Sequence, residues 1–354
     1  MKILLVTNNF FINDGGSYTA ISELSYALNK KKEVIAKIFH NNNKYNNIFN
    51  LNNYKIVINN FDVIHIFGIW SPFISIIFYL AKKIGKNVII SPLGYLEPWS
   101  LEQSKIKKKF AWYLYQKNIL EKADCIHITS QQELNSLNKL NLNNKNFFLI
   151  PHGNLEIIYS DLKRKEKKDN KDKIILFFSR IHKKKGLLEL IEAWNILKPK
   201  NWKLDITGPI SDINYKNIIN NKIGLYNLKK DIYFSEPIFD KYSKQSKILN
   251  SDVVVLPSKN ENFAFSVCEA MSIGSVVLTS KETPWEEINQ FQAGFCLNLN
   301  NVDDIVNALK KIFILKDQDF LKIRDNAKNY IKSKFDLESI IINKFINLYK
   351  SCLS

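Results

Sequence analysis

The segment LPSKNENFAFSVCEAMSIGSVVLTS, residues 256–280, contains the clearest indication of the fold of this chain. One apolar run ends at Leu256, and a second, SVVLTS, begins after Gly274. The segment SVCEAMSIG between them has helical spacing and ends at Gly274, a residue type that commonly follows a helix C-terminus. Runs that are apolar throughout are typical of parallel strands with helices on both faces. The stretch therefore predicts a strand, a loop, a helix and a second, parallel strand.

The same order recurs along the whole chain. The apolar runs of the first half are KILLVTN, EVIAKIF, YKIVI, DVIHIFG, NVIISPLG, CIHITS and FFLIPHG, and those of the second half are KIILFFS, WKLDITG, DIYFSE, DVVVLPS, SVVLTS and GFCLNL. Amphipathic stretches alternate with them, so each half predicts a doubly wound α/β sheet. Ligands of such sheets bind at the carboxyl ends of the strands, which directs attention to the loops that follow strands.

A chain of 354 residues is longer than one hydrophobic core usually spans, which favours two domains. The charged segment YSDLKRKEKKDNKDK, residues 159–173, has little to bury and is interpreted as a linker. We expect an N-terminal Rossmann-like domain over residues 1–158 and a C-terminal one over residues 172–334, facing each other across a cleft. The last helical stretch, about 335–354, is expected to complete the N-terminal domain.

The net charge of +17 favours anionic partners such as phosphates or anionic lipids. The over-use of Asn, Lys and Ile offers a second explanation, because an A/T-rich genome produces it without selection for charge. No zinc-finger spacing or RNA-binding aromatic motif accompanies the charge, so no nucleic-acid partner is expected.

The sequence indicates a cytoplasmic protein with reduced thiols. The opening MKILLVTNN is too short for a signal peptide. In VIHIFGIWSPFISIIFYLA, the pair Ser71 and Pro72 predicts the start of a helix, so this run is interpreted as a strand, a turn and a helix rather than a membrane span. The four cysteines are scattered, which indicates neither a zinc site nor a disulfide framework: Cys125, Cys268, Cys296 and Cys352.

The segment FFSRIHKKKGLLELIEAW has the features of an anion site. A strand ends near Phe178, Arg180 and Lys185 follow in the loop, and Gly186 opens an amphipathic helix. Two cations beside a helix N-terminus suit a diphosphate, because the free N–H groups and the helix dipole also favour negative charge. The alternative is a solvated basic turn.

Two carboxylates follow the strand DVVVLPS. Glu261 is at the tip of the loop and Glu269 is on the helix, so both can reach one ligand. Carboxylates accept hydrogen bonds from the hydroxyl groups of sugar or ribose. The amides at the start of the helix could bind further ligand oxygens: Asn262, Phe263 and Ala264.

Taken together, these segments resemble glycosyltransferase family 4, retaining enzymes with the GT-B fold. SRIHKKKG is similar to the phosphate loop of that family, and ENFAFSVCEAMSIGSVVLTS to its signature of two glutamates with seven residues between them. GGSYTAISELSYALNKKKEV is similar to its glycine-rich loop and first helix. DVIHIFGIW, ISPLGYLEPWSLEQSKIKKKFAWYLYQKNILEKADCIHITSQQE and IPHG resemble the subgroup that builds bacterial surface polysaccharides.

The resemblance implies roles for the residues. Arg180 and Lys185 would hold the diphosphate of a nucleotide-sugar, Glu261 would contact the donor sugar and Glu269 the ribose. Electrostatic stabilisation of the leaving diphosphate would carry most of the rate. The resemblance also implies that backbone at two glycines approaches the phosphate or the acceptor closely, which a missing Cβ allows: Gly15 and Gly16.

The chain departs from the family at one position. A histidine common in the similar subgroup would fall within SPLG, where this chain has Leu93 followed by Gly94. An imidazole at the reacting centre is therefore in doubt, and the four histidines near strand ends are interpreted as structural: His65, His127, His152 and His182. The segment DQD at 317–319 is interpreted as a helix-capping turn, so no metal is expected.

The segment SLEQSKIKKKFAWYLYQKNILEK, residues 100–122, combines lysines with aromatic residues, among them Lys107, Lys108 and Trp112. Such a helix suits anionic lipid headgroups, and the acceptors that the family resemblance implies are glycans or polyprenyl-linked sugars. The alternative is a helix packed on the first domain with a solvated basic face.

The sequence predicts a retaining glycosyltransferase that moves a hexose from a UDP- or GDP-sugar to a growing surface glycan, such as O-antigen, lipopolysaccharide or capsule. One alternative is a sugar-nucleotide epimerase of the same fold, and a second is a non-catalytic subunit that binds a nucleotide-sugar. A phosphorylase would need a lysine for pyridoxal phosphate, and no segment resembles that site. A dehydrogenase is disfavoured because no Gly-x-Gly-x-x-Gly follows the first strand.

Overall fold

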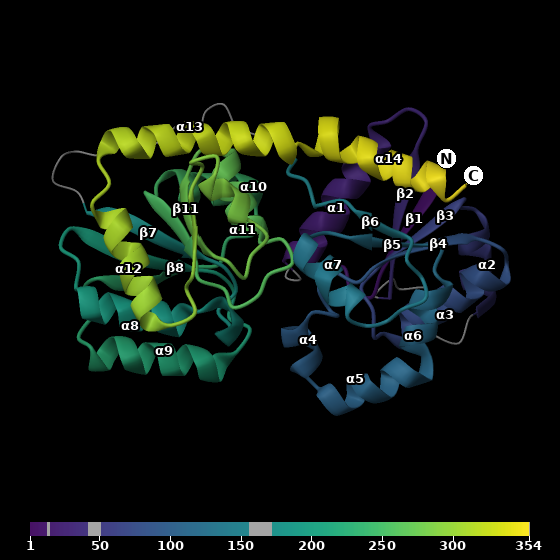
Figure 1. Cartoon of the computed structure of the whole chain (residues 1–354), viewed down its shortest axis with the longest axis horizontal. Helices are drawn as coiled ribbons and strands as arrows, with labels where there is room; N and C mark the ends of the chain where they lie inside the picture. Colours follow the sequence, from purple (N-terminus) through teal and green to yellow (C-terminus); the bar gives the residue numbers. More distant parts are fainter. Residues whose placement is uncertain (13–14, 42–50, 156–171, 354) are drawn as a thin grey trace. The chain divides into compact units, whose positions relative to one another are not determined.

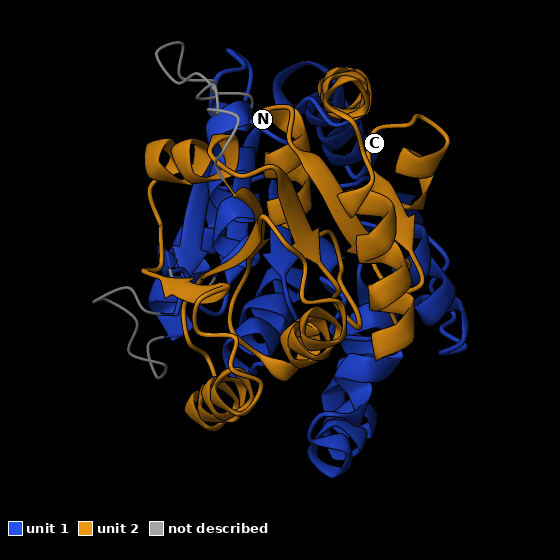
Figure 2. Cartoon of the chain, turned by 90° about the vertical axis from the view of Figure 1, so that its left-hand side faces the viewer, with its two compact units in different colours: residues 1–155, 335–354 blue, residues 156–334 orange. Residues whose placement is uncertain are grey.

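The computed structural model describes residues 1–12, 15–41, 51–155 and 172–353. Residues 159–171 of the predicted linker lie outside the described residues. The chain divides into two compact units (Figure 2), of which unit 1 is Met1–Leu155 with Phe335–Ser354 and unit 2 is Glu156–Lys334. Each unit contains a six-stranded sheet in which all the paired strands are parallel. The prediction of two α/β sheets is confirmed.

Unit 1 has the strand order β2-β1-β3-β4-β5-β6. Its strands are labelled in Figure 1. The strands are β1 Lys2–Thr7, β2 Ile35–His40, β3 Val63–Phe67, β4 Asn87–Ser91, β5 Cys125–Ile128 and β6 Phe147–Leu149. The helices are α1 Gly16–Asn29, α2 Leu51–Asn59, α3 Pro72–Lys83, α4 Pro98–Glu102, α5 Lys105–Ala111, α6 Lys117–Lys122, α7 Gln131–Asn138 and α14 Ile342–Ser351, with π-helical turns at Trp112–Gln116 and Leu337–Ile341.

The sheet of unit 1 is buried on both faces, which explains why its strands are apolar throughout. Leu4 and Val6 of β1 pack in a core cluster with α2 and α3. Ile3 and Leu5, which point the other way, pack in a second cluster with α1 and α14. The C-terminal segment, to which Phe345 contributes a buried ring, thus supplies part of the core of unit 1.

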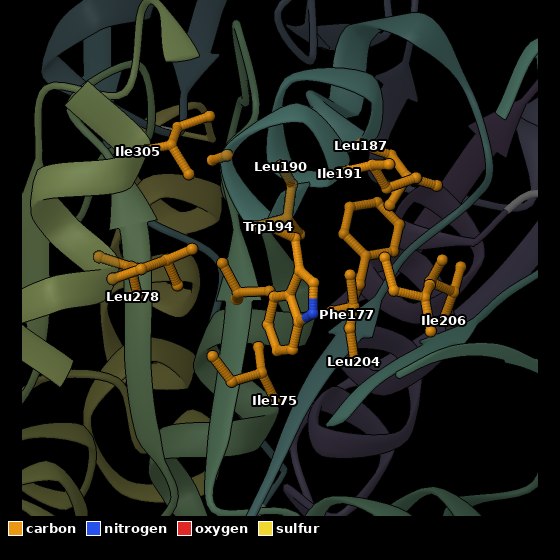
Figure 3. Close-up of a cluster of buried hydrophobic side chains, with 14 of the residues drawn as sticks. Ile175, Phe177, Leu187, Leu190, Ile191, Trp194, Leu204, Ile206, Leu278 and Ile305 are labelled. Carbon is orange, nitrogen blue, oxygen red and sulfur yellow. The ribbon is translucent and has the colours of Figure 1, made fainter. Parts of the chain in front are cut away.

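Unit 2 has the strand order β12-β11-β10-β7-β8-β9. The strands are β7 Lys173–Phe178, β8 Trp202–Thr207, β9 Ile232–Ser235, β10 Val253–Leu256, β11 Val276–Ser280 and β12 Phe295–Leu297. The helices are α8 Leu187–Leu197, α9 Ile213–Leu225, α10 Lys241–Leu249, α11 Phe265–Ser272, α12 Val302–Phe313 and α13 Asp317–Lys334. Trp194 of α8 is fully buried against β7 and β8 (Figure 3), near Ile175, Phe177 and Leu204.

One predicted strand is wrong. The run YKIVI, residues 54–58, lies in the helix α2. Tyr54 and Ile58 are buried and Ile56 is 64% exposed, a pattern that repeats at the helical spacing of four residues and not at the spacing of a strand. Three apolar residues in a row therefore do not identify a strand when only one helix face is covered.

The helix boundaries expected from capping residues are found. α3 begins at Pro72 after Ser71, α11 is followed by Gly274 with φ of 73°, and α13 begins at Asp317. Among the residues that the structure describes, no helix combines the length and the apolar character needed to cross a membrane.

Candidate functional site

The strand order of unit 2 brings the loops after β7 and β10 next to each other. From β7 the chain proceeds to β8 and β9, and from β10 it proceeds to β11 and β12 on the opposite side. Because β7 and β10 are neighbours, a topological switch point lies between them, where open α/β sheets bind ligands. The residues of unit 2 that are predicted to bind the donor follow these two strands: Arg180 and Lys185 after β7, and Glu261, Asn262, Phe263, Ala264 and Glu269 after β10.

The two loops are in direct contact. The Lys259 amide donates to the Lys184 carbonyl oxygen at 2.8 Å. Gly186, which directly precedes α8, has φ of +71°, and a Cβ there would collide with the carbonyl oxygen of Pro257. A glycine is therefore needed both for the backbone angle and for the close approach of the second loop.

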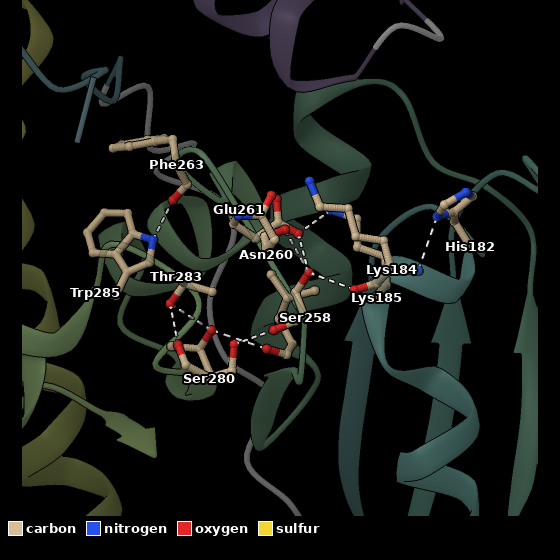
Figure 4. Close-up of polar contacts among 12 residues, drawn as sticks. His182, Lys184, Lys185, Ser258, Asn260, Glu261, Phe263, Ser280, Thr283 and Trp285 are labelled. Carbon is tan, nitrogen blue, oxygen red and sulfur yellow. Dashed lines mark hydrogen bonds and ion pairs between the residues drawn. The ribbon is translucent and has the colours of Figure 1, made fainter. Parts of the chain in front are cut away.

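Lys185 and Glu261 form an ion pair between the two loops (Figure 4), with side chains 12% and 11% exposed. The Ser258 hydroxyl also donates to Glu261 Oε1, at 2.7 Å. Burial raises the pKa of Glu261, but the charges of Lys185 and Lys184 and the hydrogen bonds from Lys185 and Ser258 outweigh it and hold the pKa below its usual value. Glu261 is therefore an ionised carboxylate beside an ammonium group, an arrangement that can bind phosphate on one side and hydroxyl groups on the other.

The loop that carries Glu261 is fixed by residues that follow β11. Trp285 is fully buried, and its indole Nε1 donates to the Phe263 carbonyl oxygen at 2.5 Å. The Glu261 amide donates to the Glu282 carbonyl oxygen at 2.9 Å. The roles of Ser258 and Trp285 are not predicted from the sequence, because neither stands in a motif with a chemical role, although Ser258 lies within residues 256–280.

Three further predicted donor residues lie in these loops or on the helix that follows: Arg180, Ala264 and Glu269. Arg180 is exposed in the loop after β7. Glu269 on α11 is 3.8 Å from the ammonium of Lys244 on α10. Ala264 precedes α11 with φ of 65°, a left-handed conformation that an alanine rarely adopts. The structure thus joins Lys185 and Glu261 directly, while Arg180 and Glu269 are not bonded to that pair.

Four of the predicted residues of unit 1 lie in two glycine turns. Gly15 precedes α1 with φ of 65°, and Gly16 is its first residue. Leu93 and Gly94, after β4, have φ of 56° and 74°. The Gly94 amide donates at 2.6 Å to Glu133, a fully buried carboxyl group whose pKa burial raises. No motif of the sequence points to Glu133, which holds the turn that contains Leu93 through this hydrogen bond.

The segment α5 and the π-helical turn after it have one inner and one exposed face. Lys108 and Trp112 are half-buried: Lys108 donates to the Ser100 carbonyl oxygen at 2.5 Å, and the rings of Trp112 and Trp70 are 6.4 Å apart. Lys107 is exposed. The exposed apolar side chains are Ile106, Phe110, Tyr113 and Leu114, between 67% and 87% exposed. Of the residues predicted for the membrane side, Lys108 and Trp112 therefore belong to the inner face.

Within the described parts of the chain, no group of three His, Cys, Asp or Glu side chains is placed to hold a metal ion. In the DQD segment, the carboxylate of Asp319 accepts a hydrogen bond from the Lys316 amide at 2.9 Å. This segment therefore caps α13, as its sequence indicates.

The comparison with protein families decides the class of the chain. Residues 159–334 match the model of the family Glycosyl transferases group 1. The chain carries a glycosyl transferases group 1 domain. It is a glycosyltransferase, and the group 1 domain covers the loops that contain Lys185 and Glu261.

Two curated relatives are similar to this glycosyltransferase. An uncharacterized 41.2 kDa protein in the cps region of Klebsiella pneumoniae is 26% identical over 310 residues, 83% of this chain and 80% of the relative. The uncharacterized glycosyltransferase MJ1607 of Methanocaldococcus jannaschii is 30% identical over 182 residues. That match spans 51% of this chain and 45% of the relative, so it concerns about half of each protein.

Solved structures show the same fold. HepE of Anabaena, in complex with UDP-glucose, has a TM-score of 0.77 at 16% identity over 99% of this chain and 100% of the other. Sucrose-phosphate synthase of Thermosynechococcus elongatus has a TM-score of 0.75 at 17% identity over 99% and 98%. The fold of the glycosyltransferase is therefore GT-B.

Proposed function

We propose that the chain is a retaining hexosyltransferase of glycosyltransferase family 4 that uses a UDP- or GDP-sugar to extend a surface glycan. The observation that carries the proposal is the Lys185–Glu261 ion pair at the switch point of a group 1 domain. The complex of HepE with UDP-glucose and the cps region of the Klebsiella relative support the donor class and the polysaccharide product.

In the proposed complex, the diphosphate lies against Lys185 and Arg180, and Glu261 accepts hydrogen bonds from hydroxyl groups of the hexose. As the bond to the sugar breaks, negative charge grows on the diphosphate, and the ammonium of Lys185 stabilises it. Glu269 binds the ribose, and the backbone at Gly15 and Gly16 approaches the phosphate or the acceptor. The turn at Leu93 and Gly94 serves the acceptor side. No residue in this scheme requires a metal.

The donor is tested by thermal unfolding in the presence of UDP, GDP and their hexose conjugates. A ligand well above its dissociation constant raises the stability by about 2–3 kcal/mol, so the unfolding temperature should rise for one base and not the other. The rise should be lost in Arg180→Ala. If no nucleotide stabilises the wild type, the proposed donor site is wrong and the non-catalytic subunit is favoured.

The reaction is tested with the donor so identified. Transfer to a polyprenyl-linked or oligosaccharide acceptor with unchanged anomeric configuration, read by NMR, is the expected result. Donor that isomerises without any acceptor indicates an epimerase instead, and inverted configuration in the product contradicts the retaining assignment.

The exposed face of α5 and of the π-helical turn after it suggests how the protein reaches a lipid-linked acceptor. Ile106, Phe110, Tyr113 and Leu114 extend into solvent beside the exposed Lys107, a combination that suits the headgroup region of an anionic membrane. We propose peripheral attachment to the inner face of the cytoplasmic membrane. Co-sedimentation with phosphatidylglycerol vesicles at low salt should fall in Phe110→Ser with Tyr113→Ser and stay unchanged in Leu321→Ser, an exposed leucine of α13. Co-sedimentation of the wild type with these vesicles at no more than the background level would contradict the proposed membrane attachment.

A further inference from the structure

Two cysteines that are far apart in the sequence meet in unit 1. Cys125 is the first residue of β5, and Cys352 directly follows α14. Their Sγ atoms are 2.8 Å apart, although 227 residues separate them. The scattered positions of the four cysteines conceal this pair in the sequence, because only the return of the C-terminal segment to unit 1 creates it.

The two thiols differ in access and in acidity. Cys125 is 2% exposed, whereas Cys352 is half-buried. The hydrogen bond between them lowers the pKa of Cys352 and raises the pKa of Cys125. Either sulfur can be the donor of this bond when both groups are thiols. A thiolate is the reactive form of cysteine, which makes the more accessible Cys352 the thiol that reacts first.

We propose that Cys125 and Cys352 are an oxidation site at which a hydroperoxide produces an intramolecular disulfide bond. This proposal is independent of the proposed glycosyl transfer. A disulfide bond is about 2.05 Å long, so the sulfur atoms need to approach each other by less than about 1 Å.

The reaction has two steps. The Cys352 thiolate attacks one oxygen of hydrogen peroxide, the O–O bond breaks, and Cys352 becomes a sulfenic acid while hydroxide leaves. The Cys125 sulfur then attacks the Cys352 sulfur, and the S–O bond breaks as the Cys125 proton joins the departing oxygen to form water. The two sulfurs lose two electrons in total, and the peroxide that gains them is reduced to water and hydroxide.

The bond would fix the end of α14 to the sheet of unit 1. α14 contributes Phe345, Leu348 and Tyr349 to the core, and the Tyr349 hydroxyl contacts His65 Nδ1 at 2.9 Å. The closed loop would include all of unit 2, and closing a long loop removes much of the freedom of the unfolded chain. Oxidation is therefore expected to stabilise the protein against loss of its C-terminal helix.

The test compares full-length protein treated with hydrogen peroxide and with dithiothreitol. After peroxide, alkylation under denaturing conditions should label two thiols fewer than in reduced protein, and a peptide should join Cys125 to Cys352. The unfolding temperature should rise by roughly 5 °C and return with dithiothreitol. Four labelled thiols after peroxide, or a link between two chains, would overturn the proposal.

Two serine variants separate this pair from the other thiols. Cys352→Ser changes a half-buried residue at a helix end, so it should fold and should lose the shift in unfolding temperature entirely. Cys296→Ser is the matched control, because a hydroxyl can keep the bond that Cys296 Sγ donates to the Ser280 carbonyl oxygen. Cys296→Ser should show the full rise in unfolding temperature after peroxide. An equal rise in Cys296→Ser and Cys352→Ser would contradict the proposed disulfide bond between Cys125 and Cys352.

Discussion

Lys185 and Glu261 connect the loops after two neighbouring strands through one nearly buried ion pair. The two residues derive from different segments of the sequence, 76 positions apart, and meet because β7 and β10 are adjacent in the sheet. In the proposed complex this pair links the phosphate side of the donor to its sugar side, so a change at one residue should affect both.

We expect Lys185→Ala to lower turnover by about 100-fold or more, because the charge that stabilises the leaving diphosphate is removed. It should also lower the free energy of unfolding by about 3 kcal/mol, since Glu261 is left as an unpaired buried charge. Activity assays and urea unfolding measure the two effects. Lys183→Ala, an exposed neighbour in the same turn, should leave both near wild-type values, and near-normal turnover in Lys185→Ala would show that the donor site is misplaced.

The proposed ribose contact of Glu269 can be tested separately from its ion pair with Lys244. The side chain of Glu269 is 20% exposed and that of Lys244 is 24% exposed. Glu269→Ala should lose most of its turnover while the protein stays folded, because a ribose contact is removed. Lys244→Ala breaks the same ion pair without removing that contact, and it should keep nearly all activity. Equal losses in the two variants would indicate that Glu269 acts through the ion pair and not through the donor. Steady-state kinetics at varied donor concentration provide the measurement.

The sequence predicts the sheets well because most strands are buried on both faces. Such a strand consists of consecutive apolar residues, which are easily recognised in the sequence. Every observed strand corresponds to one of those runs, including short ones such as β12, Phe295–Leu297. The prediction fails at residues 54–58, where a helix with a single buried face happens to place its apolar residues consecutively.

The site is less predictable than the fold, because local sequence patterns do not show which distant segments contact each other in the folded sheet. The positions of Lys185 and Glu261 in loops after strands could be predicted, but their pairing depends on which strands are neighbours. Trp285 supports the Glu261 loop from the segment after β11, and the contact between Cys125 and Cys352 depends on the return of the chain to unit 1. None of these contacts has a sequence signal.

The buried histidines of unit 1 should make stability depend on pH. His65 Nε2 and His127 Nδ1 both contact Ser91 Oγ, at 2.7 and 2.6 Å. Burial lowers the pKa of His127 to about 4 and that of His152 to about 3, and it holds the pKa of His65 well below its usual value. These groups stay neutral in the folded protein at a pH where the unfolded chain takes up protons.

The free energy of unfolding should therefore be highest above about pH 6.5 and should decrease as the pH falls from 6.5 toward 4. Keeping His127 and His152 neutral should together cost about 3 kcal/mol of unfolding free energy at pH 5.5, since each costs about 1.4 kcal/mol per pH unit below 6.5. His65, which is also held neutral, adds to this loss. Urea unfolding at pH 7.5 and 5.5 measures the difference. His127→Gln should reduce the difference by about 1.4 kcal/mol, whatever its effect at pH 7.5, and an unchanged difference would show that His127 is not held neutral.

Two glycines of unit 2 should respond in opposite ways to alanine. Gly186 has φ of +71°, and a Cβ there would collide with the Pro257 carbonyl oxygen, so Gly186→Ala should separate the two loops of the candidate site. We expect a loss of at least about 2 kcal/mol of unfolding free energy together with weaker donor binding. Gly224 lies in α9 with nothing within 4 Å of an added Cβ, and Gly224→Ala should stabilise the protein by about 0.5–1 kcal/mol. Urea unfolding and donor titration of both variants are the measurements. If Gly186→Ala kept wild-type stability and donor affinity, the close contact between the loops after β7 and β10 would not be what positions Lys185 against Glu261.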